Sequence, residues 1–169
     1  MQSATANDCT DLSHLPSNRQ NVHMYLDTIW HQYFLDIPCM NEVQIAYRHP
    51  WKSRLGTIRM TVDNKISCIG LNALLLHQHI PEYLLITTIA HELAHYAHGF
   101  GSPLPRLYQH PHANNVVNSE LERRGLGAYV EKSNRWIDKQ WFSFYDKEYQ
   151  SGWVGIPAAF RPTHRRYQP

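Results

Sequence analysis

The chain has only three cysteines, and they are not arranged as in a cysteine-based site. Cys9, Cys39 and Cys68 are far apart, odd in number, and without any Cys-x-x-Cys pair. A disulfide framework and a zinc site built from cysteines are therefore not indicated. The three thiols are more typical of a protein from the reducing cytoplasm.

The sequence also lacks the segments that direct a chain to or across a membrane. No apolar run approaches the length needed to span a bilayer. Residues 1–20 are rich in Ser, Asn, Asp and Thr, and they lack the basic start and apolar centre of a signal peptide. We therefore expect a cytoplasmic protein that has no membrane partner.

Neither sign of charge predominates. There are 16 Lys and Arg against 14 Asp and Glu, so the formal net charge is +2, with 12 His counted as neutral. This balance leaves no strong footprint for nucleic acid, which gives such a partner little support. Arg161, Arg165 and Arg166 make the end of the chain locally basic, and we interpret that end as a solvated tail.

The length of 169 residues and the apolar content of 43% are those of one folded domain. We place this domain at residues 21–149. It follows a flexible segment, 1–20, and precedes an extended or disordered basic tail, 150–169, which is rich in Gly and Pro.

Hydrophobic periodicity predicts an α+β fold. Apolar residues recur with helical spacing over 21–36 and 82–98, and a shorter helical pattern covers 113–124. Ser133 is a candidate N-cap for a last, aromatic-rich helix. Segments 43–47, 55–61 and 66–71 have the pattern of strands, and Asp63-Asn64-Lys65 has turn chemistry that predicts a hairpin between the last two. We expect a small, mostly antiparallel three-stranded sheet packed against the first two helices, with further helices following.

The segment 87–95 holds the most informative residues of the chain. His91 and His95 are four residues apart, so on a helix both reach one metal ion, and Glu92 lies about 100° round the axis, beside a metal-bound water. The surrounding residues are apolar on most sides, which predicts a buried helix that begins near Pro81. Burying two imidazoles and a carboxylate is costly without partners, and a divalent cation supplies one.

A catalytic zinc usually has three protein ligands, so a third donor is needed. His98 is one turn beyond His95, where a third ligand has poor geometry, and we interpret it as a residue of the helix end. His110 and His112 follow a loop long enough to return to the metal, while Glu120 and Glu122 belong to the next predicted helix. The residues themselves leave these alternatives open.

A family resemblance favours His112. Arg54-Leu55-Gly56-Thr57-Ile58-Arg59, then Leu71-Asn72, Pro81-Glu82 and Ile89–His95 resemble, in order and spacing, the core of SprT-like zinc metalloproteases, the Spartan/SprT group. Pro111-His112 looks like the Pro-His-Gly-x-x-aromatic pattern of that family's third histidine, although Ala113 and Val116 replace the glycine and the aromatic residue. The resemblance implies a zincin-like fold, with His91, His95 and His112 as zinc ligands and Glu92 as general base. The family's C-terminal zinc ribbon is absent, since no cysteine follows Cys68.

The function expected from these residues is zinc-dependent hydrolysis of peptide bonds in a protein or peptide substrate. Two alternatives stay open. Glu120-Leu121-Glu122 is similar to the Glu-x-Glu pattern of ImmA/IrrE-like regulatory proteases, which would make Glu120 the third ligand. A non-catalytic, zinc-stabilised binding protein is the other, although such a site needs no base. The donor that stabilises the oxyanion stays unassigned among Tyr96, His98, Tyr108 and His110.

Overall fold

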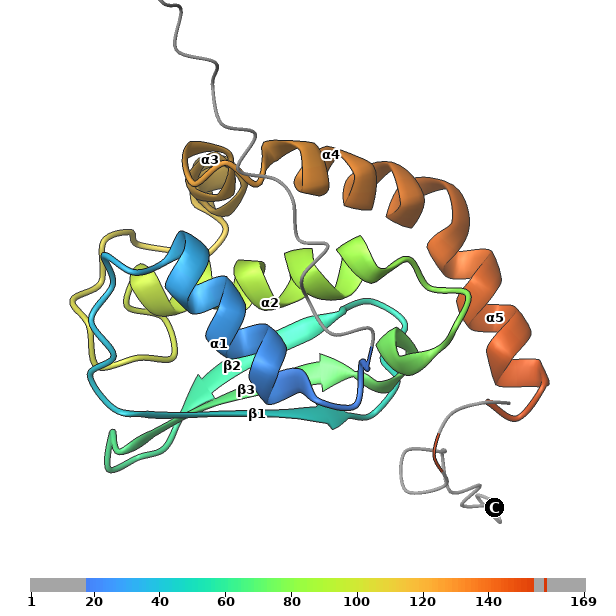
Figure 1. Cartoon of the computed structure of the whole chain (residues 1–169), viewed down its shortest axis with the longest axis horizontal. Helices are drawn as coiled ribbons and strands as arrows, with labels where there is room; N and C mark the ends of the chain where they lie inside the picture. Colours follow the sequence, from blue (N-terminus) through green and yellow to red (C-terminus); the bar gives the residue numbers. More distant parts are fainter. Residues whose placement is uncertain (1–17, 154–156, 158–169) are drawn as a thin grey trace, which may run out of the picture.

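The computed structural model describes residues 18–153 and 157, and it confirms the α+β class (Figure 1). The strands are β1 (Glu42–Arg48), β2 (Gly56–Met60) and β3 (Ile66–Asn72). The α-helices are α1 (Val22–Tyr33), α2 (Glu82–Ala97), α3 (Val116–Arg123), α4 (Gly127–Trp136) and α5 (Phe142–Gln150). Short 3-10 helices cover Ala73–Leu76 and Ala113–Asn115, and a π-helical segment, Ile137–Trp141, joins α4 to α5.

The sheet has the strand order β1-β3-β2. The predicted hairpin is confirmed, because β2 and β3 pair antiparallel, with Ile58 opposite Ile69. The expectation of a mostly antiparallel sheet is wrong, because β1 pairs with β3 in parallel. The chain reverses after β1 and again after β2, so β3 runs in the direction of β1, and it lies between the two earlier strands.

Helix α2 is the centre of the fold, and its burial confirms the prediction from its apolar surroundings. It packs against α1, α3, α4, β2 and β3, and 13 of its 16 residues are buried. Figure 1 shows α1 and α2 on the same face of the sheet, with α3 and α4 on the far side of α2. The histidine motif is thus held by packing on several sides.

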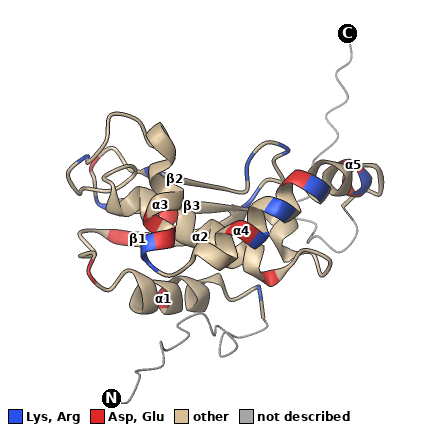
Figure 2. Ribbon diagram, turned by 90° about the horizontal axis from the view of Figure 1, so that it is seen from above, with Lys and Arg blue, Asp and Glu red and all other residues tan. Residues whose placement is uncertain are grey.

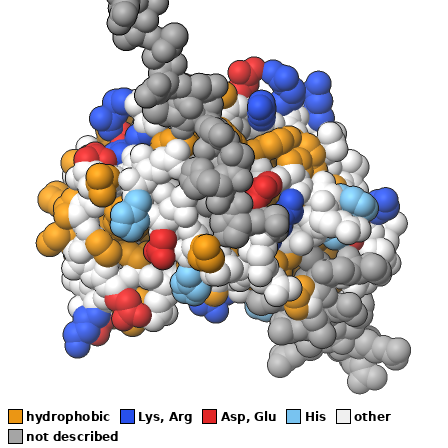
Figure 3. Space-filling view, viewed as in Figure 1, with side chains coloured by type: hydrophobic (Ala, Val, Ile, Leu, Met, Phe, Trp, Pro, Cys, Tyr) orange, Lys and Arg blue, Asp and Glu red, His pale blue; other side chains and the backbone are white. Residues whose placement is uncertain are grey.

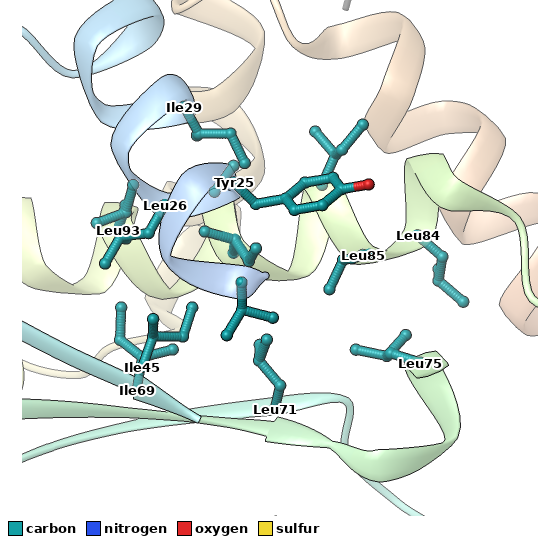
Figure 4. Close-up of a cluster of buried hydrophobic side chains, with 14 of the residues drawn as sticks. Tyr25, Leu26, Ile29, Ile45, Ile69, Leu71, Leu75, Leu84, Leu85 and Leu93 are labelled. Atoms are coloured by element: carbon teal, nitrogen blue, oxygen red, sulfur yellow. The ribbon is translucent and has the colours of Figure 1, made fainter. Parts of the chain in front are cut away.

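The hydrophobic core fills the space between the sheet and its two covering helices (Figure 4). The amphipathic face of α1 contributes Tyr25 and Ile29, and Leu85 comes from α2. Ile69 and Leu71 rise from β3, the central strand. All five are at most 1% exposed, so α2 is fixed relative to the sheet by close packing.

The helices after the motif differ from their predicted bounds. Helix α3 begins at Val116 rather than near Ala113, because Asn114 and Asn115 adopt positive φ angles of 52° and 59°. Ser133 is not an N-cap. It lies inside α4, where it is buried and its Oγ is 2.7 Å from Oγ1 of Thr87.

The packed part of the chain reaches beyond 21–149 at both ends. Arg19 donates hydrogen bonds to the backbone oxygens of Leu75 and His77, at 3.1 and 2.8 Å. Trp153 is 2% exposed, and its backbone N–H donates to the backbone oxygen of Glu148 at 2.8 Å. The expected flexibility of 1–17 and the basic tail with Arg161, Arg165 and Arg166 lie outside the described residues. Within the described part, no helix is long and apolar enough to span a bilayer.

Candidate metal centre

Helix α2 brings the two motif histidines together. His91 and His95 are one turn apart, and their Nε2 atoms are 3.1 Å from each other. Two nitrogen ligands bound tetrahedrally at 2.0–2.1 Å from zinc would be about 3.3 Å apart. The pair therefore already has close to the spacing that one metal ion requires.

His112 completes a three-histidine cluster. One ring nitrogen from each of His91, His95 and His112 lies within 4.8 Å of the other two. The His112 ring stacks on that of His91 at 5.5 Å between centroids, and it meets the His95 ring edge-on at 4.7 Å. The structure thus brings together the three ligands that the family resemblance implied, and this cluster could hold a metal ion.

The loop that carries His112 is attached to the end of α2. Gly99 and Gly101 have φ angles of 80° and 71°, which let the chain turn back directly after the helix. The N–H of Leu107 donates to the oxygen of His98 at 3.1 Å, and Ser102 Oγ donates to the oxygen of Tyr96 at 2.6 Å. These bonds hold the loop beside the helix, so that its far end returns to the motif.

The electrostatic state of the cluster suits a cation. Burial, followed by the neighbouring His112, lowers the pKa of His91 to about 4. Burial, followed by the nearby histidines, lowers the pKa of His95 to about 3. Both rings are therefore neutral at pH 7 with lone pairs free to bind metal. Among the described residues, Nδ1 of His95 is buried without a hydrogen-bond partner.

Glu92 lies beside the histidines and is 4% exposed. Burial raises the pKa of its carboxyl group to about 8, and it is the sole cause of that shift. Strand β2 passes close to this carboxylate: a Cβ atom on Gly56 would be 2.6 Å from Oε1 of Glu92 and 2.9 Å from Cγ2 of Thr88. Glycine is the residue that permits this approach.

The structure does not bring the glutamate alternative into the cluster. Glu120 is bound by Arg123 and by Nε of Arg124, the latter at 2.7 Å, and Nε2 of His98 is 3.6 Å away. Burial alone would raise the pKa of Glu120, but the hydrogen bonds from the two arginines lower it below its ordinary value. His110 and Glu122 are exposed and lie outside the three-histidine cluster.

The histidines and Glu92 line one long cleft of about 910 Å³. Its other lining residues come from the segment 52–59, from α2 before His91, from the loop at Phe100, Gly101 and Pro111, and from α3, α4, the π-helical segment and the start of α5. None of the four oxyanion candidates lines it. Tyr96 points elsewhere, since its hydroxyl accepts from the N–H of Met40 and donates to Oδ1 of Asn41, both at 3.0 Å.

Sequence reasoning missed the cleft residues of α4 and α5, because no local pattern marks a residue as lining a distant site. No protein-family model, curated protein or solved structure matches this chain. The function must therefore be inferred from the geometry of the site.

Proposed function

We propose that this protein is a zinc-dependent metallopeptidase that cleaves protein or peptide substrates. One observation carries the proposal: three histidines converge beside a buried glutamate, and all four side chains line one cleft. The likeness of the motif residues to SprT-like proteases supports it. His91, His95 and His112 would hold the zinc.

Zinc bound here would supply a Lewis acid and lower the pKa of its bound water towards about 7. Glu92 is the base that the site needs. Its raised pKa belongs to the metal-free site, and a cation beside the carboxylate would favour the charged form and bring the pKa down. Ionised, Glu92 accepts the proton of the attacking water and passes it to the leaving amine.

The free edge of β2 supports an extended peptide as substrate. Antiparallel pairing alternates. The oxygen of Leu55 accepts from the N–H of Asn72 at 2.7 Å, and the N–H of Thr61 donates to the oxygen of Ile66 at 2.9 Å, so both residues bond to β3. Residues between them at even positions, including Gly56 and Ile58, therefore direct their N–H and C=O groups away from β3. Gly56–Arg59 line the cleft, so a substrate strand added to this edge would pass Glu92.

Both alternatives fit the geometry less well. A glutamate-ligand protease of the ImmA/IrrE type needs a free Glu120 at the metal, whereas two arginines bind this side chain. A purely structural zinc needs neither a base nor a cleft, whereas here Glu92 lies beside the histidines and lines a cleft.

Free thiols on Cys39 and Cys68 suit a reducing compartment, and we propose that the protein is cytoplasmic.

The test is hydrolysis of an unfolded protein, such as reduced and alkylated casein, by protein prepared with one equivalent of zinc. We expect cleavage that a chelator abolishes and added zinc restores, and no cleavage by Glu92→Gln at equal zinc content. Stoichiometric zinc without any cleavage of unfolded proteins or peptides would overturn the proposal, as would full activity in Glu92→Gln.

A further inference from the structure

The cleft continues well past the metal cluster, along α2 towards its N-terminus. Thr88 and Leu84 line this extension, one and two turns before His91. With a rise of 1.5 Å per residue, Leu84 is about 10 Å from His91 along the helix axis, the length of about three residues of extended chain. A substrate that passes the metal therefore has several of its residues in this extension.

The part of the cleft near Leu84 has a large apolar lining. Leu55, Leu84, Val130, Ile137, Trp141 and Phe142 supply it, and the neighbouring polar lining residues are Lys52, Ser53, Arg54, Ser133 and Asn134. Leu84, Val130 and Trp141 are buried, whereas Phe142 is 55% exposed, so the aromatic ring at the mouth is free to cover a bound side chain. Ile137 and Trp141 are the first and last residues of the π-helical segment, a rare backbone form that is often found at functional sites.

Three hydroxyl groups that line this part of the cleft are already bonded within the protein. Oγ1 of Thr87 and Oγ of Ser133 are 2.7 Å apart, and Oγ1 of Thr88 donates to the oxygen of Leu84 at 2.7 Å. An apolar side chain placed above them leaves these hydroxyl groups paired, whereas a charged one would lose water and gain no partner from them.

The end wall is firmly held. Nε1 of Trp141 donates to the oxygen of Lys52 at 2.7 Å. Nδ2 of Asn72 donates to the oxygens of Trp51 and Arg54, at 2.7 and 2.9 Å. The loop before β2 is thereby tied both to the π-helical segment and to the end of β3. A pocket with anchored walls selects side chains by size and polarity better than a mobile one.

The course of β2 sets which part of the substrate meets this pocket. The strand starts at Gly56, beside Thr88 and Glu92, and runs towards Gly101, whose Cβ would be 3.0 Å from Cγ1 of Ile58. A substrate strand paired antiparallel to β2, the more stable arrangement, runs the opposite way. Its residues after the cleaved bond then lie towards the apolar extension.

We propose that this extension is a specificity pocket for a bulky apolar side chain, Leu, Met, Phe or Tyr, within the first three residues after the cleaved bond. Leu84, Val130, Ile137, Trp141 and Phe142 form it. The inference rests on the proposed peptidase function, and it names the substrate class of the same site.

Cleavage sites in a digested proteome, mapped by mass spectrometry, test the selectivity directly. We expect the four apolar residues to be enriched at least about threefold at one of the three positions after the cleaved bond. An even distribution at these positions, or enrichment only before the bond, would overturn the pocket while leaving the peptidase function intact.

A matched pair of variants on α5 locates the selectivity. Phe142 and Tyr149 are exposed to similar extents, 55% and 52%, but only Phe142 lines the cleft. For two peptides that differ by Phe or Ala at the selected position, we expect kcat/KM to differ about tenfold in the wild type. Phe142→Ala should reduce this ratio at least about threefold, and Tyr149→Ala should preserve it. Equal ratios in the wild type and Phe142→Ala would exclude Phe142 from the pocket.

Binding separates failure of the pocket from failure of the chemistry. The same two peptides, labelled with fluorescein, are titrated with zinc-loaded Glu92→Gln protein. Tighter binding of the Phe peptide, weakened in Glu92→Gln/Phe142→Ala, would support the pocket even if the wild type cleaved neither peptide. Equal binding of both peptides would overturn it.

Discussion

Gly56 lies so close to the Glu92 side chain that a larger residue at position 56 would collide with the carboxylate. The nearest atom to an added Cβ at position 56 is Oε1 of Glu92, at 2.6 Å, and the next is Cγ2 of Thr88, at 2.9 Å. Contacts below 3.0 Å force a shift, and the end of the Glu92 side chain moves more easily than a buried methyl group. The position of the Glu92 carboxylate therefore depends on the absence of a side chain at position 56 of β2.

Gly56→Ala should accordingly damage activity more than stability. We expect kcat/KM to fall about 10- to 100-fold, because a displacement near 1 Å at a reacting group has costs of that order. The melting temperature should fall by only a few degrees. Peptide hydrolysis and calorimetry on the zinc-loaded protein would measure both. Unchanged activity would show that Glu92 works from another position.

The third ligand can be identified by zinc affinity. Loss of a ligand should weaken binding by more than the 10- to 100-fold typical of a residue that only supports one, so we expect a loss greater than about 100-fold in His112→Ala. His110→Ala, a neighbouring exposed histidine, is the control and should bind zinc as the wild type does. Retention of zinc in His112→Ala, with its loss in Glu120→Gln, would instead indicate a glutamate-ligand site.

Metal-free protein should show the raised pKa of Glu92 in its pH-dependent stability. The folded pKa is about 8 and the ordinary value is 4.5, so the folded state retains a proton that the unfolded state releases between these values. The contribution of protonated Glu92 to the free energy of unfolding is full below pH 4.5 and is lost as the pH rises through 8. Glu92→Gln, which stays neutral, should therefore become progressively more stable than the wild type as the pH rises from 4.5 to 8.

Urea unfolding of both metal-free proteins at pH 4.5, 6 and 8 measures that difference. Titration of His91 and His95, whose lowered pKa values reduce stability as the pH falls below 6.5, affects both proteins and cancels in the comparison. A difference independent of pH would show that Glu92 is not protonated in the metal-free fold.

Removal of the Arg124 side chain should destabilise the fold more than removal of most other charged side chains. Its side chain is 7% exposed, bonds to Glu120 at 2.7 Å and Asp36 at 2.6 Å, and lies over the ring of Phe34 at 4.3 Å. Arg124→Ala leaves the buried Glu120 with one arginine fewer and should cost about 3–5 kcal/mol in denaturant unfolding. Arg135 has a side chain that is 61% exposed and pairs with Glu131. Arg135→Ala should therefore change the free energy of unfolding by no more than about 0.5 kcal/mol.

Nucleic-acid binding should be weak and sensitive to salt. Charges of both signs alternate along α4 and α5 (Figure 2), and on the face in Figure 3 the basic groups are spread over several places, with one small gathering at the upper right beside an acidic group. Duplex and single-stranded DNA titrations at low and physiological salt, with and without residues 154–169, which follow the buried Trp153, test this. Tight binding that survives both physiological salt and truncation would favour a DNA-associated protease.

Local patterns in the sequence were enough to predict α1, α2, the hairpin and the meeting of His91 with His95 on one helix face. Apolar periodicity fixes which side of a helix is buried, and the four-residue spacing of His91 and His95 fixes that they share a face. His112 needed a family resemblance, because nothing local shows where a loop of this length returns.

The wrong predictions concern interactions between distant segments. The parallel pairing of β1 with β3 depends on where the chain crosses, which neither strand encodes alone. Ser133 has the chemistry of an N-cap, but burial against Thr87 uses its hydroxyl group inside a helix. Asparagine tolerates positive φ better than most residues, so Asn114-Asn115 was the available sign that α3 would begin late.

The exposed edge of β2 has a further consequence for self-association. An unpaired edge strand is normally a template on which another copy of the chain can add, leading to aggregation. Here Gly56–Arg59 of this strand line a cleft that is also lined by Val130 and Asn134 of α4 and by Ile137 of the π-helical segment. A single extended strand can enter that space, but a strand that is already part of a folded sheet brings neighbours that would collide with α4. The residues of the proposed substrate pocket would therefore also hinder edge-to-edge assembly of the folded protein.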